Sequence, residues 1–525
     1  MGALHRSLRL IALAVVIIGA GTLSSCSSSD DSASDTPAST TTVPFAAESP
    51  TEITSPPAKG TVNLPQPAAP VPENYVQEEF FVGGTATRFD AKDTPEDGKW
   101  TAAPTGEEKY RTRVIVRHPK NAADFSGTVL LEWFNVSALE ASPDWALMND
   151  EIIREGHAYI GVSAQKQGVE GGGTLLEVEV DPEQAASLGE TAPSKSGLKK
   201  IDPARYGTLV HPGDAYAYDI FSQVGRAVDQ QPAKLLGDLK PQQVIAAGES
   251  QSAAFMTTLV NAVHPLAPTF DGFLIHSRGA NGAPIDGKIT RGDGNQEDES
   301  GIASRAILVR TDLDVPVFMF ETETDLTLLQ YSRARQPDTD LIRTWEVAGT
   351  SHADAHFIRS IVGGPRDPNI GSLLKCEDPI NTGPQHEVLQ AGFSWLVKWV
   401  ADGTPPPAGT RIELASEDPA EIARTDDDIA LGGVRNPLVD VPVAATTGEP
   451  PAGKSNEDVR DDICLLFGTT TTFDKATLLD RYGSADEYVK QFRASAAKAV
   501  AAGFLLQADA DELIAEAEAN RKLFA

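Results

Sequence analysis

The stretch that most constrains the fold is an apolar run, Val244–Ala247, which leads through Gly-Glu-Ser-Gln-Ser at 248–252 into a helix-compatible segment. A strand, tight turn and helix of this kind hold the central serine, Ser250, in a strained backbone conformation, so that its hydroxyl stands clear of the sheet. Residues two before and two after must be small because strand and helix pass close together. Gly248 and Ser252 meet this requirement, although the common form of the motif has glycine at both places. Ser250 could instead end a strand and cap the next helix, so these residues alone leave a catalytic and a structural interpretation open.

Two later segments offer the groups that a nucleophilic serine needs, in the order serine, acid, histidine. The serine needs a histidine to accept its proton, and the imidazolium then needs a carboxylate to orient it. A strand predicted at 315–320 precedes three acidic residues, and a strand predicted at 342–347 ends in a loop that contains His352. The three acidic residues are Glu321, Glu323 and Asp325. Asp325 is the preferred triad acid because a short side chain suits a tight loop. Glu323 remains an alternative, because in an extended chain its side chain would point the same way as that of Asp325. At least two of the three acidic side chains should be solvated.

The segments around these positions predict a mostly parallel sheet flanked by helices, the α/β class. Alternating patterns at 75–89 and 110–118 indicate half-exposed antiparallel strands at a sheet edge. The runs 127–133 and 157–163 are more continuously apolar and enclose a helical pattern at 145–155, which is typical of parallel strands covered on both faces. Further strands are predicted at 272–276, 315–320 and 342–347, and helices at 212–228, 385–401 and 475–525.

The N-terminus has the pattern of a bacterial export signal. Residues 1–25 carry two arginines, an apolar run too short to span a membrane, and small residues before Cys26. The end of this segment resembles the lipobox of lipoproteins, in which the cysteine is diacylated; an ordinary signal peptide with a chance cysteine is the alternative. Residues 26–60 are rich in Ser, Thr and Pro and predict a disordered tether. We therefore expect an exported protein anchored on the outer side of the cell membrane.

The domain predicted at 61–525 contains two segments of special interest. Residues 277–305, rich in Gly, Asp and Asn, are a candidate lid. Their acidic run invites a calcium-loop interpretation, but the sixth position is Asp298 where glycine is needed, and the twelfth is Ser304 where a bidentate glutamate is needed. Residues 465–525 predict a helical C-terminal extension, with a separate helical domain left open.

Charge and cysteine content limit the partners. A net charge of −31 argues against nucleic acid, which requires concentrated Lys and Arg. The sequence has no HExxH, no paired CxxC and no phosphate-binding glycine loop, so we expect neither a metal nor a nucleotide cofactor. With Cys26 lipidated, Cys376 and Cys464 form an even pair in an oxidising compartment and predict a disulfide, with two buried free thiols as the alternative.

Four motifs together resemble a bacterial group of α/β-hydrolase domain proteins. These are Glu132–Ser137, Gly248–Ser252, Gly349–Asp354 and Gly432–Arg435. The likeness runs from about residue 71 to the C-terminus. In the α/β-hydrolase superfamily the serine, acid and histidine follow the fifth, seventh and eighth strands, a placement that Ser250, Asp325 and His352 fit; family spacing also puts the acid where Asp325 stands. The resemblance implies fold and catalytic groups but is nearly silent on substrate.

An oxyanion hole should accompany such a serine. The first donor should be the backbone N–H of Gln251, aided by the helix N-terminus. The second should come from the loop after strand 127–133, where Asn135 and Val136 are the candidates, since no His-Gly-Gly-Gly run exists there.

Together these features predict a serine hydrolase that cleaves a small-molecule carboxylic ester through an acyl-enzyme. Ser250 would attack, His352 would carry the proton and the acid would hold the imidazole. His356 lies one helical turn beyond His352, so either histidine could be a cap or a core residue instead. An amidase or peptidase on the same scaffold and a non-catalytic binding lipoprotein that kept the fold remain the alternative functions.

Overall fold

The computed structural model describes residues 45, 47–63, 65, 71–138, 140–172, 176, 196–287, 304–364, 366–449 and 462–525. The predicted signal peptide, the proposed lipidation site Cys26, most of the predicted tether and residues 288–303 of the predicted lid lie outside these residues. In the described ranges no helix is both long enough and apolar enough to cross a membrane.

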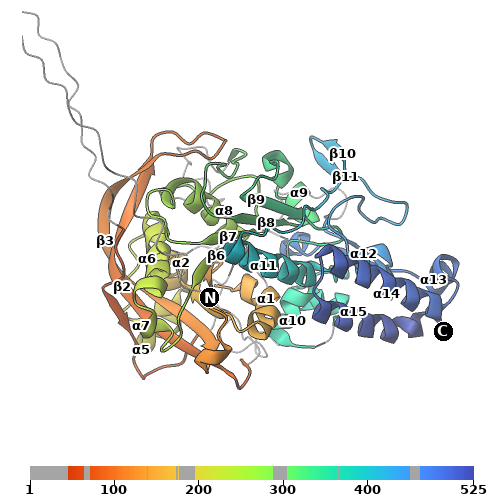
Figure 1. The fold of residues 1–525 in the computed structure, drawn as a ribbon, viewed down its shortest axis with the longest axis horizontal. Helices are drawn as coiled ribbons and strands as arrows, with labels where there is room; N and C mark the ends of the chain where they lie inside the picture. Colours follow the sequence, from red (N-terminus) through yellow and green to blue (C-terminus); the bar gives the residue numbers. More distant parts are fainter. Residues whose placement is uncertain are drawn as a thin grey trace, which may run out of the picture. The chain divides into compact units, whose positions relative to one another are not determined.

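A nine-stranded sheet forms the centre of the fold, in the order β1-β2-β3-β5-β4-β6-β7-β8-β9 (Figure 1). The strands are β1 (Glu52–Thr54), β2 (Tyr75–Ala91), β3 (Ala102–Pro119), β4 (Thr128–Trp133), β5 (Ala158–Val162), β6 (Gln243–Glu249), β7 (Gly272–His276), β8 (Val317–Glu321) and β9 (Ile342–Glu346). The pairings from β5 through β9 are parallel, and β1, β2 and β3 join antiparallel at one edge. The predicted α/β class and mostly parallel sheet are confirmed.

Helices cover both faces of the sheet. They are α1 (Pro143–Arg154), α2 (Lys166–Glu170), α4 (Leu198–Ile201), α5 (Pro203–Tyr206), α6 (Ala217–Gln230), α7 (Pro232–Leu235), α8 (Gln251–Thr258), α9 (Glu323–Thr327), α10 (Ala355–Val362), α11 (Gln385–Asp402), α12 (Pro437–Asp440), α13 (Lys475–Tyr482), α14 (Ala485–Ala502) and α15 (Gln507–Ala519). Helices α6 and α8 pack on one face, and α1 and α11 on the other.

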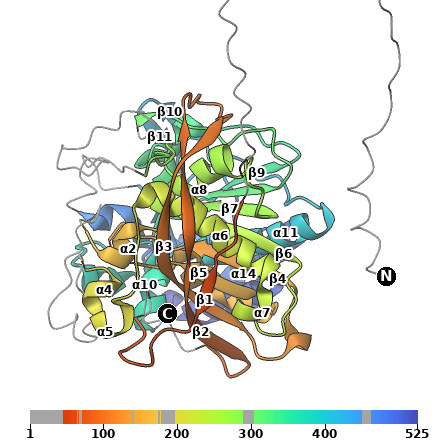
Figure 2. The same cartoon turned by 90° about the vertical axis from the view of Figure 1, so that its left-hand side faces the viewer.

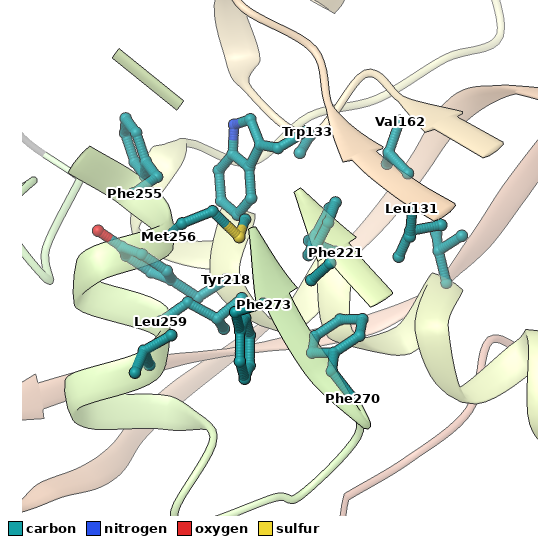
Figure 3. Packing of buried hydrophobic residues seen from close by; sticks show 14 of the residues in the cluster. Leu131, Trp133, Val162, Tyr218, Phe221, Phe255, Met256, Leu259, Phe270 and Phe273 are labelled. Carbon is teal, nitrogen blue, oxygen red and sulfur yellow. The ribbon is translucent and has the colours of Figure 1, made fainter. Parts of the chain in front are cut away.

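The parallel strands are mainly apolar because both of their faces are buried, although β4 contains Glu132 and β9 contains Arg343 and Glu346. Alternate residues of β4 enter two different cores: Leu131 and Trp133 face α6 and α8, whereas Leu130 faces α1 and α11. The Trp133 ring lies 5.0 Å from the rings of both Phe221 and Phe255, measured between centroids (Figure 3). In contrast, β2 and β3 pair with each other over their full length (Figure 2). The half-exposed pattern predicted at 110–118 is wrong, because β3 lies between β2 and β5 and is buried from Thr112 to Pro119.

Three predicted boundaries are wrong. The tether does not extend to residue 60, because β1 pairs with β2 and the Phe45 ring packs 5.2 Å from that of Phe89. The helix predicted from Pro212 begins instead as a 3-10 turn at Asp214 and becomes α6 at Ala217, since Gly213 has φ 140°. The C-terminal extension is not helical from 465, because β13 (Thr469–Thr472) first pairs with β12 (Ala444–Thr447).

The C-terminal segment is part of the main body. Residues Phe45–Ala525 form one compact unit, so α13–α15 are not a separate domain. Within it α14 and α15 pack side by side (Figure 1), and the short strands β10 (Leu414–Glu417) and β11 (Ala420–Ile422) form their own hairpin. The predicted disulfide is present: Cys376 and Cys464 are bonded across 88 residues of chain.

Candidate active site

Ser250 lies at the apex of the turn between β6 and α8. Its backbone has φ 58° and ψ −117°, a region that non-glycine residues rarely adopt. Its N–H donates to the carbonyl oxygen of His276 on the neighbouring strand, 2.9 Å away. A Cβ atom at Gly248 would lie 2.8 Å from the carbonyl oxygen of Ser252, so only glycine fits at this position without a shift of backbone. The local sequence therefore builds the strained turn that the motif predicts.

Three side chains from separate segments meet at this turn. His352 Nε2 lies 2.8 Å from Ser250 Oγ, and His352 Nδ1 lies 2.7 Å from Asp325 Oδ1. Burial by itself would lower the pKa of His352, but hydrogen bonding to Asp325, together with the charges of Asp325 and Glu249, raises it above its usual value. The arrangement can move a proton from the serine hydroxyl to the imidazole, which is the requirement for nucleophilic attack.

Asp325 is held rigidly by the start of α9. Its Oδ2 accepts hydrogen bonds from the backbone N–H and the hydroxyl of Thr322, both at 2.7 Å, while the Thr322 hydroxyl accepts from the Asp325 N–H. This reciprocal pair is a capping box. The capping box fixes Oδ2, so that Oδ1 of the same carboxylate is directed at His352.

The expectation that two of the three acidic residues would be solvated is wrong. Glu321, Glu323 and Asp325 are all fully buried. Glu323 accepts from the N–H groups of Gly349 and Gly448 and pairs with Arg424 at 2.6 Å. The segment after α11 covers this loop, which the spacing of the acids could not indicate.

Glu321 and His356 lie in the protein interior and do not take part in the contacts among Ser250, His352 and Asp325. Burial raises the pKa of Glu321 well above its usual value, with Asp325 adding to the effect and the nearby guanidinium of Arg278 opposing it. The His356 ring stacks on His386 with centroids 3.5 Å apart, inside the layer between α10 and α11. Both are therefore core residues.

The loop after β4 distinguishes the two candidate oxyanion donors. The Asn135 N–H donates to the Ala141 carbonyl at 3.0 Å and is already used. The Val136 N–H points to the elbow and donates to the side-chain Oε1 of Gln251 at 3.3 Å. The Gln251 N–H is in the first turn of α8, where helix N–H groups have no intrahelical acceptor. The Val136 and Gln251 N–H groups are thus the pair that can face an oxygen beside Ser250.

Sequence reasoning missed Glu249, and it named Asn135 only as a backbone donor and not for its side chain. Glu249, 7% exposed, lies with Oε1 3.3 Å from His352 Nε2. Asn135 Nδ2 donates to Glu249 Oε2 at 3.0 Å and to the Glu249 carbonyl at 3.1 Å. Burial is the main cause that raises the pKa of Glu249, to about 7. The only signal in the sequence for these two side chains was that Asn135 lies in the motif Glu132–Ser137 and Glu249 in the motif Gly248–Ser252, both of which resemble the family.

A second buried histidine lies directly behind the elbow. His276 Nδ1 is 2.9 Å from Asp144 Oδ1, and both residues are fully buried. Burial lowers the pKa of His276 to about 4 and raises that of Asp144 to about 8. Over the described ranges, no group of three or more His, Cys, Asp or Glu residues is arranged to hold a metal ion.

Comparison with known proteins shows which family the chain matches. A family model described as "Alpha/beta hydrolase domain" matches residues 36–515. Similar solved structures include acetyl xylan esterase 1 from Thermoanaerobacterium sp., with 12% identity over 50% of this chain and 80% of that chain, at a TM-score of 0.25. They also include a glucuronoyl esterase from Solibacter usitatus, with 10% identity over 58% of this chain and 82% of that chain, at a TM-score of 0.28. No curated protein matches.

Proposed function

Because the chain belongs to the α/β-hydrolase domain family, we propose that it is a serine hydrolase that cleaves a carboxylic ester of a small molecule. The observation that carries the proposal is the continuous hydrogen-bond chain from Ser250 through His352 to Asp325 at a strained elbow. The resemblance in sequence and the fold shared with esterases support a hydrolase in general; the ester bond and the roles of the residues are the proposal.

The first half of the reaction acylates the serine. Ser250 Oγ attacks the ester carbonyl carbon while His352 Nε2 takes its proton, and the carbonyl electron pair moves onto oxygen. The N–H groups of Val136 and Gln251 stabilise that oxyanion, after the Gln251 side chain has left the Val136 N–H. The ester C–O bond then breaks, and the Nε2 proton passes to the leaving alkoxide.

The second half returns the enzyme to its starting state. A water molecule gives a proton to His352 Nε2 and attacks the acyl carbon, and the oxyanion forms again. The bond to Ser250 Oγ then breaks, with the Nε2 proton returning to the serine. Asp325 stays ionised and stabilises the imidazolium in both halves.

Covalent labelling tests the proposal directly. A fluorophosphonate should label the wild type at Ser250, and Ser250→Ala should abolish both labelling and the turnover of p-nitrophenyl esters. Ser252→Ala is the matched control, because in the described part of the chain the Ser252 Oγ is buried without a hydrogen-bond partner. Labelling that persists at another serine in Ser250→Ala would contradict the assignment.

A substrate panel separates the chemical alternatives. Esters of graded acyl length should be hydrolysed faster than amides with the same acyl group. Faster turnover of the amides would make the protein an amidase or peptidase. A wild type that is neither labelled nor active would favour a binding protein that kept the fold.

We also propose that the protein is exported and anchored through a diacylated Cys26. The charge, apolar and small-residue pattern of residues 1–26 supports this. Two acyl chains give stable membrane attachment where one does not. Mass spectrometry of membrane-fraction protein should find the lipid on Cys26, and Cys26→Ser should release the protein or block its maturation. A wild type cleaved elsewhere and recovered in soluble form would contradict the anchor.

A further inference from the structure

The site contains a second carboxylate that the proposed reaction does not use. Glu249 immediately precedes Ser250, and its side chain is 9% exposed. Its Oε1 is 3.3 Å from His352 Nε2, the atom that also lies 2.8 Å from Ser250 Oγ. The imidazole is therefore between two carboxylates: Asp325 faces Nδ1, and Glu249 faces Nε2.

Glu249 also contacts the loop that supplies an oxyanion donor. Its Oε2 accepts from Asn135 Nδ2 at 3.0 Å, and the next residue, Val136, carries the donor N–H. Asn135 is itself fixed by paired backbone hydrogen bonds with Ala141, at 3.0 and 2.8 Å. One carboxylate thus joins the base to the oxyanion loop.

We propose that Glu249 is a positioning residue of the catalytic machinery, which in its ionised form stabilises the protonated His352 and aligns it with the loop that carries the Val136 N–H. This inference rests on the proposed function. A negative charge beside Nε2 makes the imidazole a stronger base just when it receives the serine proton. It acts in the same direction as Asp325 but from the opposite side of the ring.

The surrounding charges set the direction of the pH effect. Glu249 is faced by His352 from the loop after β9, His276 from β7, Asp144 from α1 and Asp325 from α9. The two histidines favour the ionised carboxylate and the two aspartates oppose it. Glu249 and His352 therefore titrate as a coupled pair, and such a pair gives two ionisations where an isolated histidine gives one.

The rate of fluorophosphonate labelling, followed against pH, tests the inference without depending on an ester substrate. In this reaction the Ser250 Oγ–P bond forms, the P–F bond breaks with fluoride taking the electron pair, and the serine proton goes to His352 Nε2. The wild-type rate should rise with pH through two ionisations. Glu249→Gln should leave one ionisation, with its midpoint lower by about one pH unit and a plateau several-fold lower.

Two further variants separate charge from packing. Glu249→Asp keeps the charge and should recover part of the midpoint shift. Asp354→Asn removes another buried carboxyl from the histidine loop, one that does not contact His352 Nε2, and should leave the midpoint in place.

The outcomes are distinguishable. Labelling of Glu249→Gln with an unmoved midpoint would overturn this inference alone, whereas a wild type that is not labelled would overturn the proposed function with it. If Glu249→Gln does not fold, the wild-type profile decides, because a single ionisation there is incompatible with a coupled pair.

Discussion

Glu323 and Arg424 form an ion pair of 2.6 Å in which the carboxylate is fully buried, two residues before the aspartate that contacts His352. Glu323 and Asp325 are two residues apart in the sequence, but their carboxylates bind different groups. Asp325 turns to the imidazole, whereas Glu323 holds Arg424 and the backbone N–H groups of Gly349 and Gly448.

Opposite phenotypes should follow for the two acids. Asp325→Asn should lower kcat on the order of a thousandfold or more, because the histidine loses its orienting carboxylate, with little change in Tm. Glu323→Gln should instead destabilise the fold by about 1–3 kcal/mol, because the buried carboxylate that binds Arg424 and two backbone N–H groups becomes a neutral amide. Arg424 keeps its contacts with Glu449 at 3.3 Å and Asp428 at 3.5 Å. The kcat of the folded Glu323→Gln protein should stay within about tenfold of wild type. Thermal denaturation and steady-state kinetics on both variants check this.

A double variant provides the control. Glu323→Gln combined with Arg424→Gln should be less destabilised than the sum of the single variants, because each single change already removes the interaction that the two residues share. If the losses in free energy of unfolding are additive, the interaction between Glu323 and Arg424 does not contribute to stability. A collapse of kcat in Glu323→Gln with near-normal Asp325→Asn would reassign the acid.

The side chain of Gln251 occupies a donor that the reaction needs. Its Oε1 accepts from the Val136 N–H, so the substrate must displace it. Gln251→Ala keeps the backbone donor and removes the competitor, and kcat/KM should rise by about threefold to tenfold, the value of one ordinary hydrogen bond. Gln251→Glu should lower kcat/KM, because a carboxylate holds the N–H more strongly and repels the oxyanion. A fall in Gln251→Ala would instead mean that the amide binds substrate.

Asp354 should make stability depend on pH. It caps α10 by accepting from the Phe357 N–H, and burial raises its pKa to about 7. An unfolded chain ionises this group near pH 3.8, so between that pH and about 7 the folded protein binds an additional proton, and its stability falls as pH rises. Asp354→Asn keeps an oxygen that can cap the helix without this titration. Its Tm relative to wild type should therefore increase from pH 4 to 7 and stay level above; a constant difference would contradict the assignment.

The disulfide should matter for stability and not for chemistry. Cys376 and Cys464 close a long loop remote in sequence from the elbow. Replacing both with serine should cost about 2–5 kcal/mol, while the kcat measured at 25 °C should remain near wild type. Thermal denaturation of the oxidised wild type, the reduced wild type and the double variant measures the loss. Equal Tm values in all three would mean that the bond constrains nothing.

The strands and the elbow could be predicted because their signals are short-range. An apolar run with Gly248 and Ser252 around a serine specifies its own turn, and the strands 272–276 and 342–347 were located within one residue. Long-range contacts left no such pattern. Arg424 lies 101 residues from Glu323, so nothing in the local sequence showed that this glutamate is buried.

The same limit applies to the inner side of the site. Glu249 reaches Asn135 across 114 residues of chain, and the Gln251 side chain reaches Val136 across 115. A motif names the residues at a turn but does not say which direction their side chains take. The choice between Asn135 and Val136 likewise depended on the pairing of Asn135 with Ala141, a backbone contact that side-chain identity does not encode.

The hydrogen bond from the Gly448 N–H to Glu323 spans 125 residues, and through Gly349 the same carboxylate holds the loop that carries His352. During synthesis from the N-terminus, Ser250, Asp325 and His352 all leave the ribosome before Gly448 does. When Ser250, Asp325 and His352 have already emerged, the nascent chain therefore still lacks the hydrogen bond from the Gly448 N–H to Glu323. This contact of the histidine loop is consequently one of the last to form in each molecule, after most of the polypeptide has been made.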